Sequence, residues 1–244
     1  MAADGQRHIL AIGGIGGLGL RDELPALIVH ALAISGAGGV PRVCVLNTAV
    51  GDDPAGYLRQ YSRLSQYGAR VSHLQLFPMP NVTDPEDLLL SQDVIFVGGG
   101  SVANMLAVWR VHGVDQFMRR AWESGVVLSG VSAGAICWFD GGTTDSFGPE
   151  LRPFTEGLGL LRGSYCPHYS SEPTRRPAFQ SLVANGTLAA GIACDDGTAA
   201  HYVEEKLAEI VADQPGVTGY LVEADGSGAA TERALPTRLL APGS

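Results

Sequence analysis

Apolar and polar residues alternate in blocks along the first two thirds of the chain. Apolar residues at helical spacing, such as Leu24, Leu27, Ile28 and Ala31, are followed by a glycine and then by a short apolar run. Blocks of this kind are typical of βαβ units, which build a mostly parallel sheet covered by helices. We expect strands at residues 8–12, 43–46, 71–77, 93–97 and 126–128, and helices at 22–34, 57–67, 102–111 and 114–123.

The pattern changes after Asp140. Residues 141–153 are rich in Gly, Thr and Pro and predict an irregular loop. No linker or internal repeat interrupts the sequence, so we expect an α/β fold in one domain that spans residues 1–244. The later elements are a strand at 163–169, a helix at 173–184, and short strands at 188–194, 198–203, 209–211 and 219–222 that form an antiparallel or mixed edge of the main sheet.

Composition narrows the class of protein. Hydrophobic residues make up 45% of the 244 residues and charged residues 17%, which is enough to build a packed core. The net charge of −9 comes without any Lys or Arg run, so we expect neither a nucleic-acid nor a membrane partner. The first residues are polar and lack the apolar segment of a secretory signal, and the four cysteines form no CxxC pair. These features predict a cytoplasmic protein with reduced cysteines.

Ser132 is the strongest candidate for a chemical role. It follows the strand predicted at 126–128 in the pentapeptide Gly130-Val131-Ser132-Ala133-Gly134, and a short helix is expected after it. A serine on such a sharp strand-to-helix turn projects its hydroxyl outward, and the small flanking residues avoid a clash. The alternative is a tight turn in which Ser132 only caps the helix. We interpret Ser132 as the nucleophile of a serine hydrolase.

Two glycine-rich turns are expected at the same edge of the sheet. Gly98-Gly99-Gly100 ends the preceding central strand, and an N–H group there, together with that of Ala133, would form an oxyanion hole. The alternative is a flexible turn without substrate contact. The turn at residues 13–17 resembles a dinucleotide fingerprint only loosely, and we expect it to line the cleft instead.

His168 is the favoured general base among six histidines. It lies at the end of the strand predicted at 163–169 and precedes a polar segment that starts a helix, which places the imidazole at the edge where the elbow opens. A carboxylate must orient this ring. Asp196 is the first choice, because it follows the strand predicted at 188–194. Its competitors are Asp195, Asp145 and Asp140.

With these residues placed, the chain resembles the dipeptidase E and cyanophycinase family of serine peptidases, whose fold is similar to that of class I glutamine amidotransferases. The resemblance rests on the segments 96–101, 130–135, 166–169 with 172–177, and 195–199. It implies a three-layer sandwich with a mostly parallel sheet between helices. It also implies a small peptide substrate cleaved next to aspartate.

The resemblance further implies a triad with Ser132 as nucleophile and His168 as base. It implies an oxyanion hole from Gly99 or Gly100 with Ala133. The third triad member differs within the family. Relatives of cyanophycinase carry Glu where Asp196 stands, and dipeptidase E uses an Asp that falls near Asp145 here. The candidate substrate-binding residues are Glu172, Arg175 and Arg176, although the two arginines also fit a solvated helix face.

Three other functions remain open at this stage. A glutamine amidotransferase needs Cys where Ser132 stands, and Cys137 lies one helical turn further on. An esterase of the α/β-hydrolase type would use Ser132, Asp196 and His201. A binding protein could keep the elbow as a fold element only. The sequence implies neither a metal nor an organic cofactor, and it is compatible with a homodimer.

Overall fold

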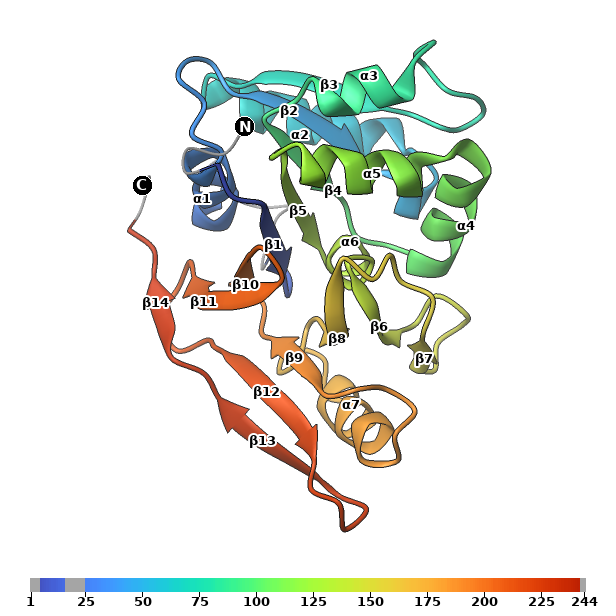
Figure 1. Cartoon of the computed structure of the whole chain (residues 1–244), viewed down its shortest axis with the longest axis vertical. Coiled ribbons are helices and arrows are strands. Elements are labelled where there is room, and N and C mark those ends of the chain that lie inside the picture. The colour runs from blue at the N-terminus through green and yellow to red at the C-terminus, as the bar shows by residue number, and fades with distance from the viewer. Residues whose placement is uncertain (1–4, 16–24, 242–244) are drawn as a thin grey trace.

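The computed structural model describes residues 5–15 and 25–241, and within them the main sheet has eight strands. Their order is β14-β11-β10-β1-β5-β4-β2-β3 (Figure 1). Five neighbouring strands, β1, β5, β4, β2 and β3, run parallel to one another, and β10 is antiparallel to β1. The parallel strands are β1 (His8–Ile12), β5 (Val127–Val131), β4 (Val94–Val97), β2 (Arg42–Leu46) and β3 (Arg70–Leu74). On the other side of β1 lie β10 (Thr198–Val203), β11 (Lys206–Ala212) and the edge strand β14 (Thr237–Leu239).

Helices cover both faces of this sheet because successive strand residues point to opposite sides. Leu10 and Ile12 of β1 pack in one hydrophobic cluster, and Ile9 and Ala11 pack in another. The first cluster lies under α1 (Ala26–Ile34) and α2 (Pro54–Gln66). The second lies under α3 (Pro85–Leu90), α4 (Val102–His112) and α5 (Val114–Glu123). This is the three-layer α/β sandwich that the sequence predicted, and the fold class is confirmed.

Side chains at the helix starts explain where several helices begin. Asp84 accepts a hydrogen bond from the backbone N–H of Asp87 and caps α3, and Ser101 caps α4 through the N–H of Asn104. Asp53 caps α2, whose first residue is a proline. Within the described residues, no helix combines the length and the apolar composition needed to cross a membrane.

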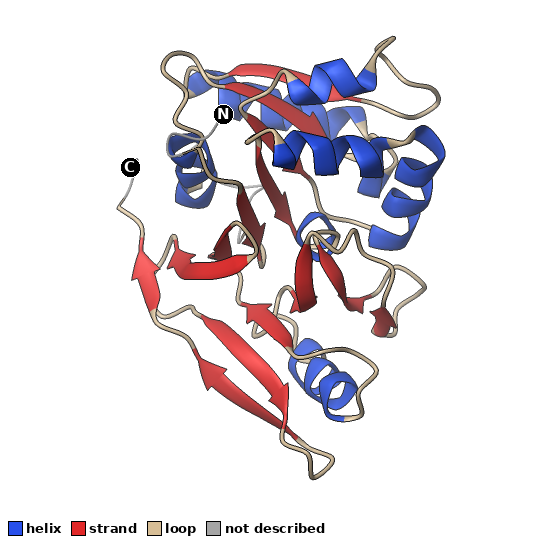
Figure 2. Cartoon of the chain, in the orientation of Figure 1, coloured by secondary structure: helices blue, strands red, loops and turns tan. Residues whose placement is uncertain are grey.

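A second sheet lies beside the first and contains most of the strands that follow β5 in the chain (Figure 2). Helix α7 (Arg175–Ala184) packs on it through Phe179 and Val183, which meet Val222. The short α6 (Ala133–Ile136) and the 3-10 helix η1 (Thr48–Val50) complete the helices of the described residues. In spatial order the strands are β13 (Ala230–Ala234), β12 (Gly219–Ala224), β9 (Gly191–Cys194), β8 (Leu161–Cys166), β6 (Phe139–Thr144) and β7 (Arg152–Phe154).

This second sheet corrects two sequence-based expectations. The strands expected at 188–194 and 219–222 belong to it and do not extend the main sheet, and the expected loop at 141–153 contains most of β6 and the start of β7. The glycines there suggested a loop, but they serve close strand packing. A Cβ on Gly141 would collide with the carbonyl oxygen of Phe154, and one on Gly142 with that of Tyr165.

Candidate active site

Ser132 lies on the turn between β5 and α6 with φ 56° and ψ −115°, a left-handed conformation that is rare for a residue with a side chain. A Cβ on Gly130 would collide with the carbonyl oxygen of Gly134, and one on Gly134 with that of Val97. The Ser132 hydroxyl makes no cap hydrogen bond to α6. The Ser132 side chain therefore does not cap α6, and this argues against the alternative in which capping is its only role.

Three backbone amides in the turns next to Ser132 have no acceptor in the described part of the chain. The amides of Gly98 and Ser101 donate to Leu46 and Ala49, whereas those of Gly99 and Gly100 between them have no acceptor among the described residues. The amide of Ala133, the first residue of α6, has none either in this part of the chain. A Cβ on Gly99 would lie 3.2 Å from the Cβ of Ser132, so this turn faces the serine directly.

Gly100 contacts a different part of the fold from Gly99. Its φ is 135°, and a Cβ there would collide with the carbonyl oxygen of Ala49. Gly99 is thus the member of the triple glycine turn that lies against Ser132, while Gly100 packs against η1.

His168 and Asp196 form a close pair. The Nδ1 of His168 lies 2.6 Å from Oδ1 of Asp196, and both side chains are partly exposed. This hydrogen bond, with a smaller contribution from the charge of Arg175, holds the pKa of Asp196 below its usual range. Asp196 is therefore ionised at neutral pH and accepts a hydrogen bond from Nδ1–H of His168, which leaves Nε2 as the ring nitrogen that can take a proton from the serine.

The end of β1 joins the serine to this pair. The carbonyl oxygen of Ile12 accepts from the amide of Ser132 at 3.1 Å, and the next carbonyl, of Gly13, accepts from the amide of His168 at 3.2 Å. No hydrogen bond connects the Ser132 hydroxyl to His168 within the described residues. Ile12, the last residue of β1, and Gly13, the next residue, thus hold the backbone of Ser132 and that of His168 at the same sheet edge.

Gly14 has a role that the sequence did not reveal. A Cβ there would collide with the carboxylate of Asp196 and would lie 2.6 Å from Nδ1 of His168. The amide of Gly197 donates to the carbonyl of Gly14 at 2.7 Å, which fixes the approach. The turn expected at 13–17 reaches the site through Gly13 and Gly14, and its last two residues lie outside the described residues.

The competing carboxylates have other partners. Asp145 lies 3.6 Å from Arg175, and Asp140 accepts from the amide of Gly163. Asp195 is buried and accepts from the amide of Thr218 at 3.1 Å. His201, the base of the esterase alternative, contacts His8 and Glu209, whereas Asp196 contacts His168. The geometry therefore favours Asp196 with His168.

The three candidate substrate-binding residues are engaged within the protein. Arg175 is 3% exposed, and its guanidinium pairs with Glu172 at 2.6 Å and donates to the carbonyl of Thr143. Arg176 forms a two-armed pair with Glu232 and lies over the rings of Tyr169 and Tyr220. Arg175 is thus not a solvated helix side chain, because its charge is neutralised inside the fold.

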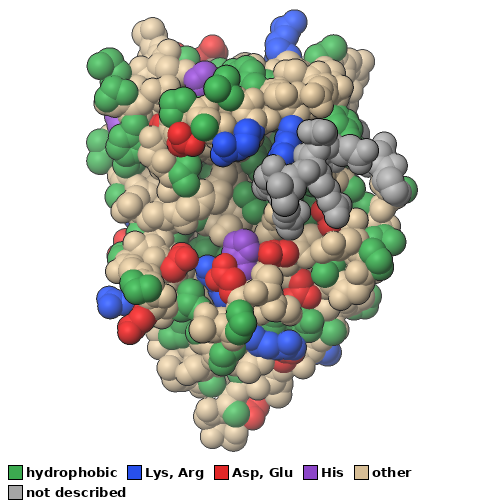
Figure 3. Space-filling view, turned by 180° about the vertical axis from the view of Figure 1, so that it is seen from behind, with side chains coloured by type: hydrophobic (Ala, Val, Ile, Leu, Met, Phe, Trp, Pro, Cys, Tyr) green, Lys and Arg blue, Asp and Glu red, His purple; other side chains and the backbone are tan. Residues whose placement is uncertain are grey.

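A cavity of about 570 Å³ adjoins the elbow. Its lining includes Gly99 and Val131 next to Ser132, and Arg59 and Arg63 from α2. Arg59 is exposed and has no ion-pair partner among the described residues. The face seen in Figure 3 carries both signs of charge, with Lys and Arg side chains on one side of a hollow and a histidine among acidic side chains on the other.

One group of side chains in the described residues has the spacing of metal ligands. It consists of His30, His201 and Glu209, and none of the residues around Ser132 belongs to it.

Comparison with known proteins identifies the family. The sequence profile of peptidase family S51 matches residues 10–210, which is most of the chain. The chain belongs to peptidase family S51. The uncharacterized peptidase YgaJ of Bacillus subtilis is 41% identical over 216 residues, covering 88% of this chain and 92% of that protein. Peptidase E of Shewanella denitrificans is 28% identical over 147 residues, covering 57% of this chain and 63% of that protein.

Solved structures agree on the fold. A peptidase from an acI-B1 actinobacterium superposes with a TM-score of 0.64 at 18% identity, with 96% of each chain covered. Membership in family S51 makes this protein a serine peptidase of the peptidase E type, and so a hydrolase. The predicted resemblance to the dipeptidase E and cyanophycinase family is confirmed.

Proposed function

We propose that this peptidase cleaves the peptide bond next to aspartate in short peptides of the Asp-Xaa type, with Ser132, His168 and Asp196 as its triad. The observation that carries the triad is the 2.6 Å contact between His168 and Asp196, held beside the serine turn by β1. A buried-strand elbow, a base and an oriented carboxylate are the three parts that serine acyl transfer requires.

In the proposed reaction, Oγ of Ser132 attacks the carbonyl carbon of the scissile bond while Nε2 of His168 takes the hydroxyl proton. The amides of Ala133 and Gly99, or Gly100 in its place, donate to the oxyanion of the tetrahedral intermediate. His168 then gives its proton to the leaving amine as the C–N bond breaks. Water hydrolyses the acyl-enzyme by the same steps, and Asp196 stabilises the imidazolium in both halves.

The charges around the site support an acidic substrate residue. Arg59 lines the cavity beside Gly99 and offers its guanidinium group to a carboxylate. A peptide that begins with aspartate carries an ammonium group and two carboxylates, so a surface with both signs of charge suits it. Arg176 has no part in this proposal, because Glu232 occupies its guanidinium.

The test is a panel of Asp-Xaa and Xaa-Asp dipeptides, neutral dipeptides and simple esters, assayed with the wild type and with S132A. We expect turnover of Asp-Xaa peptides and a loss on the order of 10³-fold or more in S132A. D196N should lose on the order of 10²- to 10⁴-fold, because the imidazole loses its orienting anion, and D145N should lose little.

Three results separate the parts of this proposal. Undiminished turnover by S132A contradicts the nucleophile, and full activity in D196N with loss in D145N transfers the orienting role to Asp145. Hydrolysis of neutral dipeptides at the same kcat/KM as Asp-Xaa contradicts the substrate class alone.

A further inference from the structure

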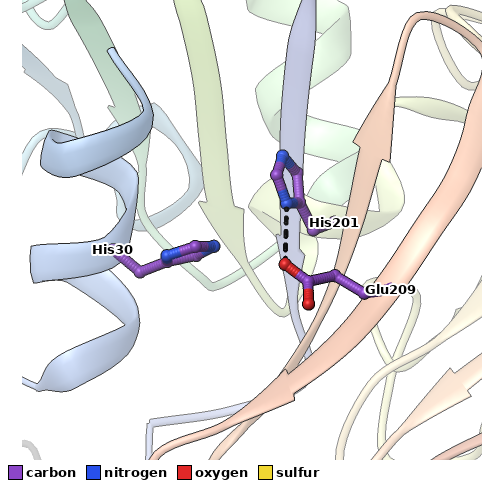
Figure 4. Close-up of side chains that lie close together, drawn as sticks. All are labelled: His30, His201 and Glu209. Atoms are coloured by element: carbon purple, nitrogen blue, oxygen red, sulfur yellow. Dashed lines mark hydrogen bonds and ion pairs between the residues drawn. The ribbon is translucent and has the colours of Figure 1, made fainter. Parts of the chain in front are cut away.

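A second cluster of reactive side chains lies at the other end of β1 from the serine turn. His8 is the first residue of β1, and His201 lies on the neighbouring β10. His30 reaches this place from α1, and Glu209 from β11 (Figure 4). These four side chains come from separate elements, and the proposed peptidase chemistry uses none of them.

Three of these residues have the arrangement of metal ligands. One nitrogen of His30, one of His201 and a carboxylate oxygen of Glu209 all lie within 4.8 Å of one another. In a tetrahedral zinc site neighbouring ligand atoms are about 3.3 Å apart, so the ligand atoms must approach by at most about 1.5 Å. Nδ1 of His201 already lies 3.5 Å from Oε1 of Glu209. Figure 4 shows the His30 ring directed from α1 toward this pair.

The His30 ring carries an atom that the fold leaves unused. Its Nε2 is buried, and no hydrogen-bond partner meets it in the described part of the chain. A buried polar atom without a partner is costly, and an ion at this place would remove that cost. Burial lowers the pKa of His30 to about 4 and also lowers the pKa of His201. Both rings are therefore neutral at pH 7, the form that binds metal.

His8 and Arg238 orient two of the proposed ligands, His201 and Glu209, by hydrogen bonds. Nδ1 of His8 lies 3.0 Å from Nε2 of His201, which fixes the ring and leaves Nδ1 of His201 for the carboxylate side. Arg238 donates to both oxygens of Glu209, at 2.8 and 2.7 Å. It orients the carboxylate, but its positive charge opposes a cation, so we expect an affinity weaker than that of a structural zinc finger.

We propose that His30, His201 and Glu209 bind a divalent transition-metal ion, with zinc as the ion that suits two imidazoles and one carboxylate. The ion joins α1 to β10 and β11 of the main sheet. A water molecule takes the fourth position. Because the cluster is separate from Ser132, the ion stabilises the fold and takes no part in the peptidase reaction.

The experiment uses untagged full-length protein treated with a chelator and then titrated with zinc sulfate against a chromophoric zinc indicator. We expect one zinc ion per chain. H30Q and E209Q should each weaken binding at least about tenfold, since each removes one ligand. H112Q, at the end of α4, and H168A, in the proposed active site, should bind as tightly as the wild type. X-ray absorption of the loaded protein should give nitrogen and oxygen ligands at about 2.0–2.1 Å.

Thermal unfolding with and without zinc distinguishes a loss of zinc binding from a loss of folding. At the same zinc concentration, zinc should raise the Tm of the wild type and of H112Q by more than that of H30Q, while circular dichroism reports that each variant is folded. Absence of zinc binding by the folded wild type overturns the proposal. Equal affinity in the wild type, H30Q and E209Q also overturns it, and loss of binding in H168A alone would assign the ion to the proposed active site.

Discussion

Gly14 determines how closely β1 can approach the His168–Asp196 pair. Its carbonyl accepts from Gly197, and its missing side chain leaves room for the carboxylate of Asp196. The position tolerates no Cβ without a shift of His168 or Asp196. At the residue scale, the site therefore depends on an absent methyl group as much as on the reactive side chains.

G14A should lower kcat by about 10²-fold or more, because a displacement of about 1 Å at a reacting group has an effect of that size. Its free energy of unfolding should fall by about 1–3 kcal/mol, as expected for overpacking. The control is G38A, at a glycine whose Cβ would meet nothing within 4 Å, and its stability should change by less than about 0.5 kcal/mol. Steady-state kinetics and urea unfolding measure both effects. A fully active G14A would show that the pair can move aside without penalty.

Helix α1 shows how an element is held by more than apolar contacts. Leu27, Ile28 and Ala31 pack on the sheet, and the His30 ring lies edge-on to the His201 ring of β10. The titratable and charged groups that face His30 are His8, His201, Glu209 and Arg238. Burial and the neighbouring positive groups keep its ring neutral in the folded state.

The stability of the protein should therefore depend on His30 as the pH falls. The pKa of His30 is about 4 in the folded chain and 6.5 by the reference value, so only the unfolded chain takes up this proton between those values. The free energy of unfolding should decrease as pH falls from about 6.5 to about 4, by up to about 1.4 kcal/mol per pH unit from this group. Urea unfolding at pH 7, 6 and 5 with a chelator present measures it. H30Q should show a smaller slope, and an equal slope would contradict this explanation.

At the scale of the whole molecule, the two sheets and their helices enclose all four cysteines. Each thiol is free and buried, and desolvation raises its pKa, to about 12 for Cys44 and Cys166, to about 11 for Cys194, and well above the usual value for Cys137. A buried protonated thiol is a poor nucleophile. The amidotransferase alternative, which needs a reactive cysteine at the elbow, has no support here.

Thiol labelling tests this arrangement. A disulfide reagent at pH 8 should modify none of the four cysteines in the native protein within minutes, and should modify four per chain in guanidinium chloride. Counting the released chromophore gives both numbers. Rapid modification of a thiol in the native state would show that the fold opens around that cysteine.

The sequence alone predicted the parallel half of the main sheet, the turn at Ser132 and the residues His168 and Asp196. These features depend on local patterns: apolar runs, helical spacing, and small residues beside a serine after a strand. The second sheet was missed because Gly141 and Gly142 look like loop residues until the neighbouring strands are known. Asp145 and Asp140 could not be separated from Asp196 by sequence either, because acidic residues after strands are common.

What the tertiary structure decided are contacts between residues far apart in the chain. In the folded chain Asp196 bonds to His168, 28 positions away in the sequence, and Asp145 pairs with Arg175. The tertiary structure also gathered His8, His30, His201 and Glu209, which no spacing rule connects, at one end of β1. Local patterns specify elements because backbone preferences and burial act over a few residues. The partner of a charged or polar side chain is set by which strand edges meet, and that order exists only once the chain has folded.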